Sequence, residues 1–294
     1  TFTPVICNGE ANGTATVLPI GGTPFYTYQW STTPMQTANS ATGLAAGQYT
    51  VTTTDANSCN RIDTVNVTQP SDISVDLDSI NVRCFGLNDG KAWVTVTGGV
   101  TPYIYSWNAG TTPNTDTLSN VPTGNYSLFT TDGNNCLDSA WVNITEPDSV
   151  IVQFTTDSTT CNKGNDGSIL AAVTGGVGTY TYQWSNIAVD TSFNNNLTAG
   201  FYTLSVTDTN NCITIDTVSV QEPAPVQLTF SVRPPTCYNG GDGWAAATIS
   251  GGNAPYTLLW VDSPQSQDTI FNRIGGRYYT AIATDAYGCM ETDS

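Results

Sequence analysis

Apolar residues alternate with polar ones in short segments all along the chain. This period of two is typical of a strand with one buried face, and no segment has the apolar spacing of an amphipathic helix. The alternation follows Asn-Gly or Asp-Gly turns and recurs in Tyr-x-Tyr-x-Trp segments, at 15–17, 92–96, 169–173, 26–30, 103–107 and 180–184. The pattern therefore predicts an all-β protein built from short antiparallel strands.

Landmarks recur every 76 or 77 residues, which divides the chain into four copies of one unit. Each copy has a leading cysteine and, 51 or 52 residues later, a trailing cysteine. The leading cysteines are Cys7, Cys84, Cys161 and Cys237, and the trailing cysteines are Cys59, Cys136, Cys212 and Cys289. A Gln-Pro or Glu-Pro pair closes each of the first three copies, so we expect domains at 1–70, 71–147, 148–223 and 224–294.

The first and last copies are shorter than the two between them. Repeat 1 has a truncated opening strand, and repeat 4 has a truncated closing strand. The ends of the sequence do not coincide with the ends of a repeat unit, and from this we expect a longer parent array.

Each copy has the signals of an immunoglobulin-like antiparallel β-sandwich. About seven short strands in about 77 residues, with turn signals every 8 to 12, are typical of that architecture. The pattern Leu44-x-x-Gly47-x-Tyr49 resembles its tyrosine corner. A tryptophan follows each leading cysteine by 23 residues, and its phase on its strand predicts that it is a core residue. We therefore expect a tandem array of four such sandwiches.

The cysteines come in four pairs with one spacing, so we expect one disulfide within each repeat. The alternatives are free thiols, metal ligation and bridges between repeats, and no Cys-x-x-Cys motif is present for zinc or redox chemistry. A bridge within a repeat would join the end of the first strand to the last hairpin. It would leave only 25 of 77 residues extensible under load, about 85 Å of chain at ~3.4 Å per residue. Disulfides also indicate an oxidising, extracellular compartment.

Charge and composition narrow the classes of function. The chain has 24 acidic and 7 basic residues, a net charge of −17, so its surface repels nucleic acid and anionic membrane. It has no histidine, which removes Ser-His-Asp and Cys-His catalysis and histidine-ligated zinc. No apolar run approaches the length of a membrane helix. We expect no catalytic residue, no enzyme activity and no direct membrane insertion.

Two kinds of candidate binding residue remain. Trp93, Trp141 and Trp244 stand where other repeats have smaller residues, on the strand face opposite the predicted core, and exposed aromatic rings stack on sugars or on partner domains. Alternating oxygen donors give weak calcium candidates at Asp55, Asn57, Asp132, Asn134, Asp208 and Asn210. Asp and Asn also favour hairpin turns, and no bidentate Glu closes these loops, so we expect no cofactor.

The landmarks together resemble the SprB repeat family. The resemblance rests on Cys84-x-Gly86-x-x-Asp89-Gly90, Gly98-Gly99-x-x-Pro102-Tyr103-x-Tyr105-x-Trp107, Gly124-x-Tyr126, Thr131-Asp132-x-x-x-Cys136 and Glu146-Pro147, and on their counterparts in the other three copies. It implies tandem repeats of gliding-motility cell-surface adhesins of Bacteroidota, which are secreted by the type IX system. Repeat 4 departs from the pattern with Leu258 in place of the second Tyr.

The same resemblance implies a sugar modification. Asp-Ser/Thr triplets like the O-glycosylation signal of Bacteroidota surface proteins place acceptors at Thr64, Ser79, Thr117, Ser139, Ser149, Ser158, Thr217 and Thr269. The triplet is also common in strands for reasons of composition alone.

The resulting hypothesis is a structural stalk or filament segment of a secreted bacterial surface adhesin involved in attachment and gliding. Its expected partners are neighbouring repeats of the parent chain and, beyond them, surface polysaccharide or other cell-surface proteins, without nucleic acid. Two alternatives stay open, a polysaccharide-binding module that uses the exposed tryptophans and a self-assembling filament subunit.

Overall fold

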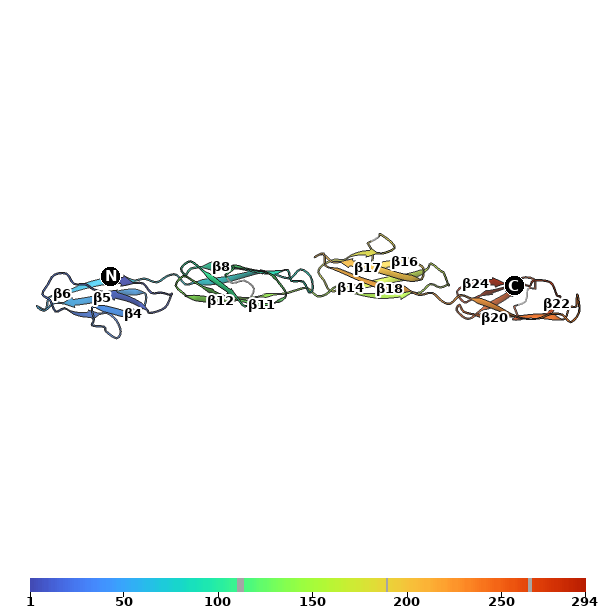
Figure 1. Cartoon of the computed structure of the whole chain (residues 1–294), viewed down its shortest axis with the longest axis horizontal. Coiled ribbons are helices and arrows are strands. Elements are labelled where there is room, and N and C mark those ends of the chain that lie inside the picture. The colour runs from blue at the N-terminus through green and yellow to red at the C-terminus, as the bar shows by residue number, and fades with distance from the viewer. Residues whose placement is uncertain (110–113, 189, 264–265) are drawn as a thin grey trace. The chain divides into compact units, whose positions relative to one another are not determined.

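The computed structural model describes residues 1–109, 114–188, 190–263 and 266–294, and within them the chain is all-β (Figure 1). The chain forms two compact units, Thr1–Glu146 and Pro147–Ser294, and each unit contains two repeats. Among the described residues no helix is long and apolar enough to cross a membrane.

Each repeat contributes six strands to the described part of the chain, one fewer than the sequence predicts. In the first unit they are β1 (Phe2–Thr3), β2 (Gly13–Thr16), β3 (Thr27–Trp30), β4 (Ser40–Leu44), β5 (Gly47–Thr54), β6 (Asn60–Val67), β7 (Ser74–Ile80), β8 (Gly90–Thr97), β9 (Ile104–Trp107), β10 (Thr117–Val121), β11 (Gly124–Thr131) and β12 (Leu137–Ile144). In the second unit they are β13 (Ile151–Asp157), β14 (Gly167–Thr174), β15 (Thr181–Trp184), β16 (Phe193–Leu197), β17 (Gly200–Thr207), β18 (Ile213–Val220), β19 (Gln227–Arg233), β20 (Gly243–Ser250), β21 (Thr257–Trp260), β22 (Thr269–Arg273), β23 (Ala281–Thr284) and β24 (Met290–Asp293).

The six strands of a repeat form two antiparallel sheets of three strands each. In repeat 2 the sheet orders are β7-β8-β10 and β9-β11-β12, and the other repeats have the same orders. These are the A-B-E and C-F-G orders of the immunoglobulin sheets, without strand D. Strands β1 and β24, at the two ends of the sequence, are the shortest counterparts of β7 and β12.

A separate apolar core lies between the two sheets of each repeat. The recurring tryptophan is buried in all four cores, as predicted, at Trp30, Trp107, Trp184 and Trp260. Its indole N–H donates to a backbone carbonyl, for example from Trp107 to Thr115 at 3.0 Å. The polar end of the ring is therefore satisfied inside the core.

The predicted tyrosine corner is present in every repeat. The hydroxyl of Tyr49 donates to the carbonyl of Ala45 at 3.1 Å, and Tyr126 and Tyr202 make the same bond to the residue four positions earlier. In repeat 4 the corner residue is Tyr279, whose hydroxyl lies 3.2 Å from the carbonyl oxygen of Ile274. The Gly-x-Tyr alignment in the sequence points instead to Tyr278, which is 86% exposed.

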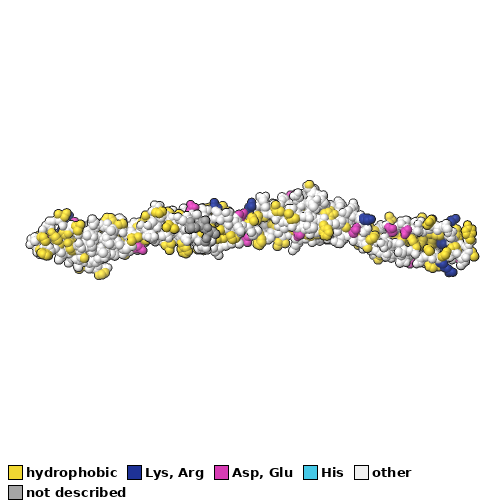
Figure 2. All heavy atoms as spheres, in the orientation of Figure 1, with side chains coloured by type: hydrophobic (Ala, Val, Ile, Leu, Met, Phe, Trp, Pro, Cys, Tyr) yellow, Lys and Arg dark blue, Asp and Glu magenta, His cyan; other side chains and the backbone are white. Residues whose placement is uncertain are grey.

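The surface of the described residues has dispersed charge. On the face shown in Figure 2, hydrophobic side chains are scattered among polar ones instead of forming one continuous patch. Only two ion pairs occur among the described residues, Arg61 with Asp63 and Arg83 with Asp89, and both are exposed. Such pairs contribute little to stability, so packing and backbone hydrogen bonding hold the fold.

Candidate functional site: the repeat junctions

The disulfides join successive repeats, so the predicted pairing within each repeat is wrong. The leading cysteine of repeat 1 bonds the trailing cysteine of repeat 2, Cys7 to Cys136, across 129 residues. Cys161 of repeat 3 bonds Cys289 of repeat 4 in the same way, across 128 residues. Cys84 and Cys212 are also disulfide-bonded, whereas Cys59 and Cys237 are free thiols.

Strand length explains why the two cysteines of one repeat cannot form a disulfide with each other. The chain beside Cys7 meets the far end of β6, where the N–H of Val5 donates to the carbonyl of Thr68 at 2.9 Å. Cys59 directly precedes the near end of β6. The eight residues of β6 separate the two cysteines by about 27 Å at ~3.4 Å per residue, and a disulfide needs Cα atoms within about 7 Å. The two cysteines of a repeat thus lie at opposite ends of its sheets.

In repeats 2, 3 and 4 a carboxylate folds the loop that carries the leading cysteine. In repeat 2 the N–H of Arg83, directly before Cys84, donates to Oδ1 of Asp89 at 3.0 Å. Thr160 bonds Asp166 and Thr236 bonds Asp242 in the same way, and Asn12 replaces the carboxylate in repeat 1. This bond gives a structural role to the Asp in the Cys-x-Gly-x-x-Asp-Gly motif.

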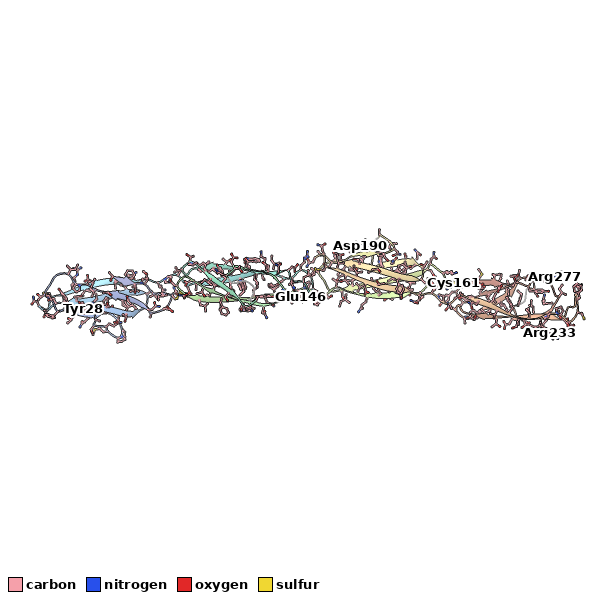
Figure 3. The ribbon with its side chains drawn as sticks, viewed as in Figure 1. Tyr28, Glu146, Cys161, Asp190, Arg233 and Arg277 are labelled. Atoms are coloured by element: carbon pink, nitrogen blue, oxygen red, sulfur yellow. A yellow bond between two sulfur atoms is a disulfide. The ribbon has the colours of Figure 1, made fainter. Side chains whose placement is uncertain are left out.

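The Glu or Gln residue before the proline that closes each of the first three repeats accepts a hydrogen bond from the leading-cysteine loop of that repeat. The N–H of Gly86 donates to Oε2 of Glu146 at 2.7 Å, and the N–H of Lys163 donates to Glu222 at 2.6 Å. In repeat 1 the acceptor is Oε1 of Gln69, at 3.0 Å from the N–H of Gly9. Glu146 lies where the chain leaves β12 (Figure 3). The Gln-Pro and Glu-Pro pairs therefore fix the leading-cysteine loop beside the start of the next repeat.

A second carboxylate folds the loop that carries each trailing cysteine. In repeat 2, Oδ1 of Asp132 accepts the N–H groups of Asn134 and Cys136 at 2.8 Å each, and Oδ2 accepts the N–H of Val100 at 2.9 Å. Asp55, Asp208 and Asp285 accept the same three bonds in their own repeats.

In three of these loops the hydrogen bonds lower the pKa of the carboxyl group. The N–H of Thr23, followed by that of Cys59, holds the pKa of Asp55 below its ordinary value of 3.8. Burial acts to raise the pKa of Asp132, and the N–H groups of Cys136, Val100 and Asn134 outweigh it, so this pKa also lies below 3.8. The balance at Asp285 is the same, with burial opposed by the N–H groups of Asn253 and Cys289. The carboxyl groups of Asp55, Asp132 and Asp285 are thus held in the charged form.

The calcium candidates take part in these loops. Asp55, Asp132 and Asp208 direct their oxygens at backbone N–H groups. Asn57 donates its Nδ2 to the hydroxyl of Thr23 at 2.7 Å. Within the described residues, no three or more Asp, Glu, Cys or His side chains are grouped so as to hold a metal.

One of these asparagines reaches across a junction. Nδ2 of Asn134, in repeat 2, donates to the backbone carbonyl of Ile6, in repeat 1, at 2.8 Å. Ile6 directly precedes Cys7, whose sulfur is bonded to Cys136. The junction between repeats 1 and 2 therefore combines a covalent bridge with a side-chain clamp on its neighbouring peptide group.

The three exceptional tryptophans lie on the outer faces of their sheets, as predicted, and on three different sheets. Trp141 in β12 is 75% exposed. Trp93 in β8 is half-buried, with the ammonium group of Lys91 5.9 Å from its ring centroid. Trp244 in β20 is also half-buried and lies beside Phe271 in the strand register. Trp93 and Trp141 thus lie on different sheets of repeat 2, and Trp244 lies in the other unit.

The expected O-glycosylation acceptors all reach the surface. Four hydroxyl residues are exposed, Thr64, Ser139, Ser158 and Thr217, and four are half-buried, Ser79, Thr117, Ser149 and Thr269. Accessibility is necessary for modification, and occupancy of these sites stays a prediction.

The strand order and the bridges define a class of protein: a tandem β-sandwich array in which disulfides link repeat 1 to repeat 2 and repeat 3 to repeat 4. The family model described as SprB repeat matches the chain four times, at residues 1–34, 78–112, 153–189 and 229–264. The chain therefore carries four SprB repeats. A comparison with curated proteins gives no match.

Several solved structures are similar to the chain at low identity. Sidekick-1 immunoglobulin domains 1-5 share 13% identity over 95% of this chain and 75% of that one, with a TM-score of 0.35. The protocadherin GammaB4 extracellular domain shares 10% over 99% and 64%, with a TM-score of 0.35. The human desmocollin-1 ectodomain shares 11% over 99% and 76%, with a TM-score of 0.28.

Proposed function

We propose that this chain is a load-bearing stalk segment of a large secreted adhesin on a bacterial cell surface, acting without catalysis. The bridges between repeats carry the proposal. They indicate an oxidising compartment, and each of them joins one repeat to the next along the chain. The high negative charge would keep such a stalk soluble.

The bridges shorten the covalent path from one terminus to the other. Tension that enters at residue 1 reaches Cys7, crosses to Cys136, follows the backbone to Cys161 and crosses to Cys289. Only the segments 1–7, 136–161 and 289–294 lie on this path. They are roughly 36 residues, about 120 Å when fully extended, against about 1,000 Å for the whole chain at ~3.4 Å per residue. The sequence-based expectation of 25 extensible residues per repeat is replaced by this shorter path.

Single-molecule pulling between the two termini tests the proposal. We expect the oxidised chain to stop extending after roughly 36 residues have been released, and the reduced chain to release almost its full length. A Cys7→Ser/Cys136→Ser variant is the matched control, because it removes the bridge of the first unit and leaves Cys161–Cys289 in place, so it should extend further than the oxidised wild type and less than the reduced chain. Equal extension of the oxidised and reduced chains would contradict a load-bearing role for the bridges.

Within this proposal, attachment and gliding on the bacterial surface, export by the type IX system and O-glycosylation remain implications of the SprB resemblance. Intact mass of the protein purified from its native surface tests the modification. We expect masses above that of the bare sequence, and a mass equal to the bare sequence would remove this part of the proposal.

A polysaccharide-binding role is the second candidate, favoured by one aromatic pair on repeat 2. Trp141 pairs with Ser127, and Phe129 pairs with Ser139, so the two aromatic residues are diagonal neighbours on the outer face of one sheet. Phe129 is 48% exposed and Trp141 is 75% exposed, and diagonal neighbours lie within reach of one sugar ring. Titration with a polysaccharide panel, followed by tryptophan fluorescence, tests this role. Saturable binding that Trp141→Ala removes and Trp93→Ala retains would support it, and binding unchanged by Trp141→Ala would not.

A further inference from the structure

The two free thiols are the two cysteines that the pairing pattern of the bridges leaves without a partner among these four repeats. The bridges Cys7–Cys136 and Cys161–Cys289 each join a leading cysteine to the trailing cysteine of the next repeat. Cys59 is the trailing cysteine of repeat 1, and Cys237 is the leading cysteine of repeat 4. The pairing rule therefore leaves one thiol of each kind, and both are exposed.

Cys59 lies in the same loop conformation as its bonded counterpart in repeat 2. Its N–H donates to Oδ1 of Asp55 at 2.9 Å, and its carbonyl accepts the N–H of Asp55 at 3.0 Å. The corresponding distances for Cys136 and Asp132 are 2.8 and 2.9 Å. The loop is thus formed without a bridge.

Cys237 likewise lies in the loop conformation of a bonded leading cysteine. The N–H of Thr236 donates to Oδ1 of Asp242 at 3.0 Å, and the N–H of Gly240 donates to the carbonyl of Cys237 at 2.8 Å. Around Cys161, the N–H of Thr160 donates to Asp166 at 3.0 Å, and Gly164 donates to Cys161 at 2.9 Å. Cys161, at the end of repeat 3 in Figure 3, is bonded to Cys289.

Asn57, two residues before Cys59, corresponds to Asn134 of repeat 2, and Asn134 contacts a second repeat. Nδ2 of Asn134 holds the carbonyl of Ile6 from the preceding repeat, at 2.8 Å. Asn57 occupies the same position in repeat 1, and its Nδ2 donates to the hydroxyl of Thr23 at 2.7 Å. Rotation of this amide toward an incoming peptide carbonyl would reproduce the junction between repeats 1 and 2.

We propose that Cys59 and Cys237 are complementary halves of the same bridge, and that each bonds the opposite kind of cysteine of another SprB repeat. In a preparation of this chain, that repeat belongs to a second copy, joined head to tail through Cys237 of one copy and Cys59 of the next. The inference is independent of the proposed load-bearing role.

The reaction is a thiol–disulfide exchange with a small-molecule disulfide such as oxidised glutathione. The thiolate of one cysteine attacks the glutathione disulfide, which forms a mixed disulfide and releases one glutathione thiol. The thiolate of the other copy then attacks the protein sulfur and releases the second glutathione thiol. Two protein thiols become one disulfide, and one glutathione disulfide is reduced to two thiols.

Two single-thiol variants of the full chain test the proposal. Cys59→Ser leaves only the leading thiol free, and Cys237→Ser leaves only the trailing thiol free. In a glutathione redox buffer, we expect an equimolar mixture to give a disulfide-linked heterodimer in about tenfold higher yield than the homodimer from either variant alone. Peptide mass mapping should find Cys237 bonded to Cys59, and the wild type should give longer ladders.

Two results would overturn the proposal. Homodimers in the same yield as the heterodimer would show that the exposed thiols oxidise without selectivity, and absence of the heterodimer would show that the two half-sites do not recognise each other. Unchanged melting temperatures of both variants confirm that serine leaves the fold intact. Pulling the Cys59→Ser/Cys237→Ser double variant as a monomer tests the load-bearing role separately, because its internal bridges are unchanged.

Discussion

Asp132 accepts a hydrogen bond from the backbone N–H of Cys136, with 2.8 Å between Oδ1 and the nitrogen. Its other oxygen accepts the N–H of Val100, and the residue is only 2% exposed. One buried carboxylate thus positions a half-cystine and joins its hairpin to the neighbouring Gly-Gly turn. Because the disulfide partner lies in another repeat, this side chain links the fold of repeat 2 to its junction with repeat 1.

Replacing Asp132 with alanine should destabilise repeat 2. The change leaves the N–H groups of Val100, Asn134 and Cys136 without their acceptor, and we expect a loss of about 2–4 kcal/mol in the free energy of unfolding. Thermal unfolding with the disulfides intact measures it. Asp76→Asn, in the middle of β7, is the control and should stay within about 0.5 kcal/mol of wild type. Equal free energies of unfolding for Asp132→Ala and Asp76→Asn would show that Asp132 does not stabilise the repeat.

Acid should destabilise the fold through the same carboxylates. The pKa values of Asp55, Asp132 and Asp285 lie below 3.8 in the folded state, so the unfolded state binds more protons in the acid range. Their contribution to stability is therefore complete above the unfolded value and is lost as the pH falls through the folded values. We expect the melting temperature to be level down to about pH 5 and to fall below about pH 4. The fall should be smaller in Asp132→Ala, and a level profile to about pH 2 in the wild type would contradict this account.

The position of this carboxylate restricts the second residue of the Gly-Gly pair, Gly99. Gly99 has φ of +62°, and a Cβ built on it would lie 2.9 Å from Oδ2 of Asp132. Gly86 in the same repeat also has positive φ, +73°, and a Cβ added there would have nothing within 4 Å. Gly99→Ala should therefore lower the free energy of unfolding by more than Gly86→Ala, which carries only the backbone cost of about 1–2 kcal/mol. Chemical unfolding of both variants measures the difference, and equal losses would mean that the carboxylate does not restrict position 99.

Strand periodicity made the architecture predictable from the sequence, and the pairing of the cysteines was not predictable from spacing alone. In a periodic chain, a bond within each repeat and a bond to the next repeat give the same intervals between cysteines. The signal that separates them is the length of the last strand, since the eight residues of β6 hold Cys7 and Cys59 at opposite ends of a repeat. The role of Glu146 in holding the leading-cysteine loop was also not predictable from the sequence. Its side-chain oxygen accepts the N–H of Gly86, which is 60 residues away in the chain.

The tyrosine corner of repeat 4 provides a test in which two adjacent tyrosines should behave differently. The hydroxyl of Tyr279 lies 3.2 Å from both the carbonyl oxygen and the N–H nitrogen of Ile274, and its ring packs against the core. Tyr278 is 86% exposed, although the Gly-x-Tyr spacing assigns it to the corner. We expect Tyr279→Phe to reduce the free energy of unfolding by about 1–2 kcal/mol, since both hydrogen bonds are lost, and Tyr278→Phe to change it by less than about 0.5 kcal/mol. Differential scanning calorimetry of the two variants measures the difference. A larger loss of stability in Tyr278→Phe than in Tyr279→Phe would assign the tyrosine corner to Tyr278.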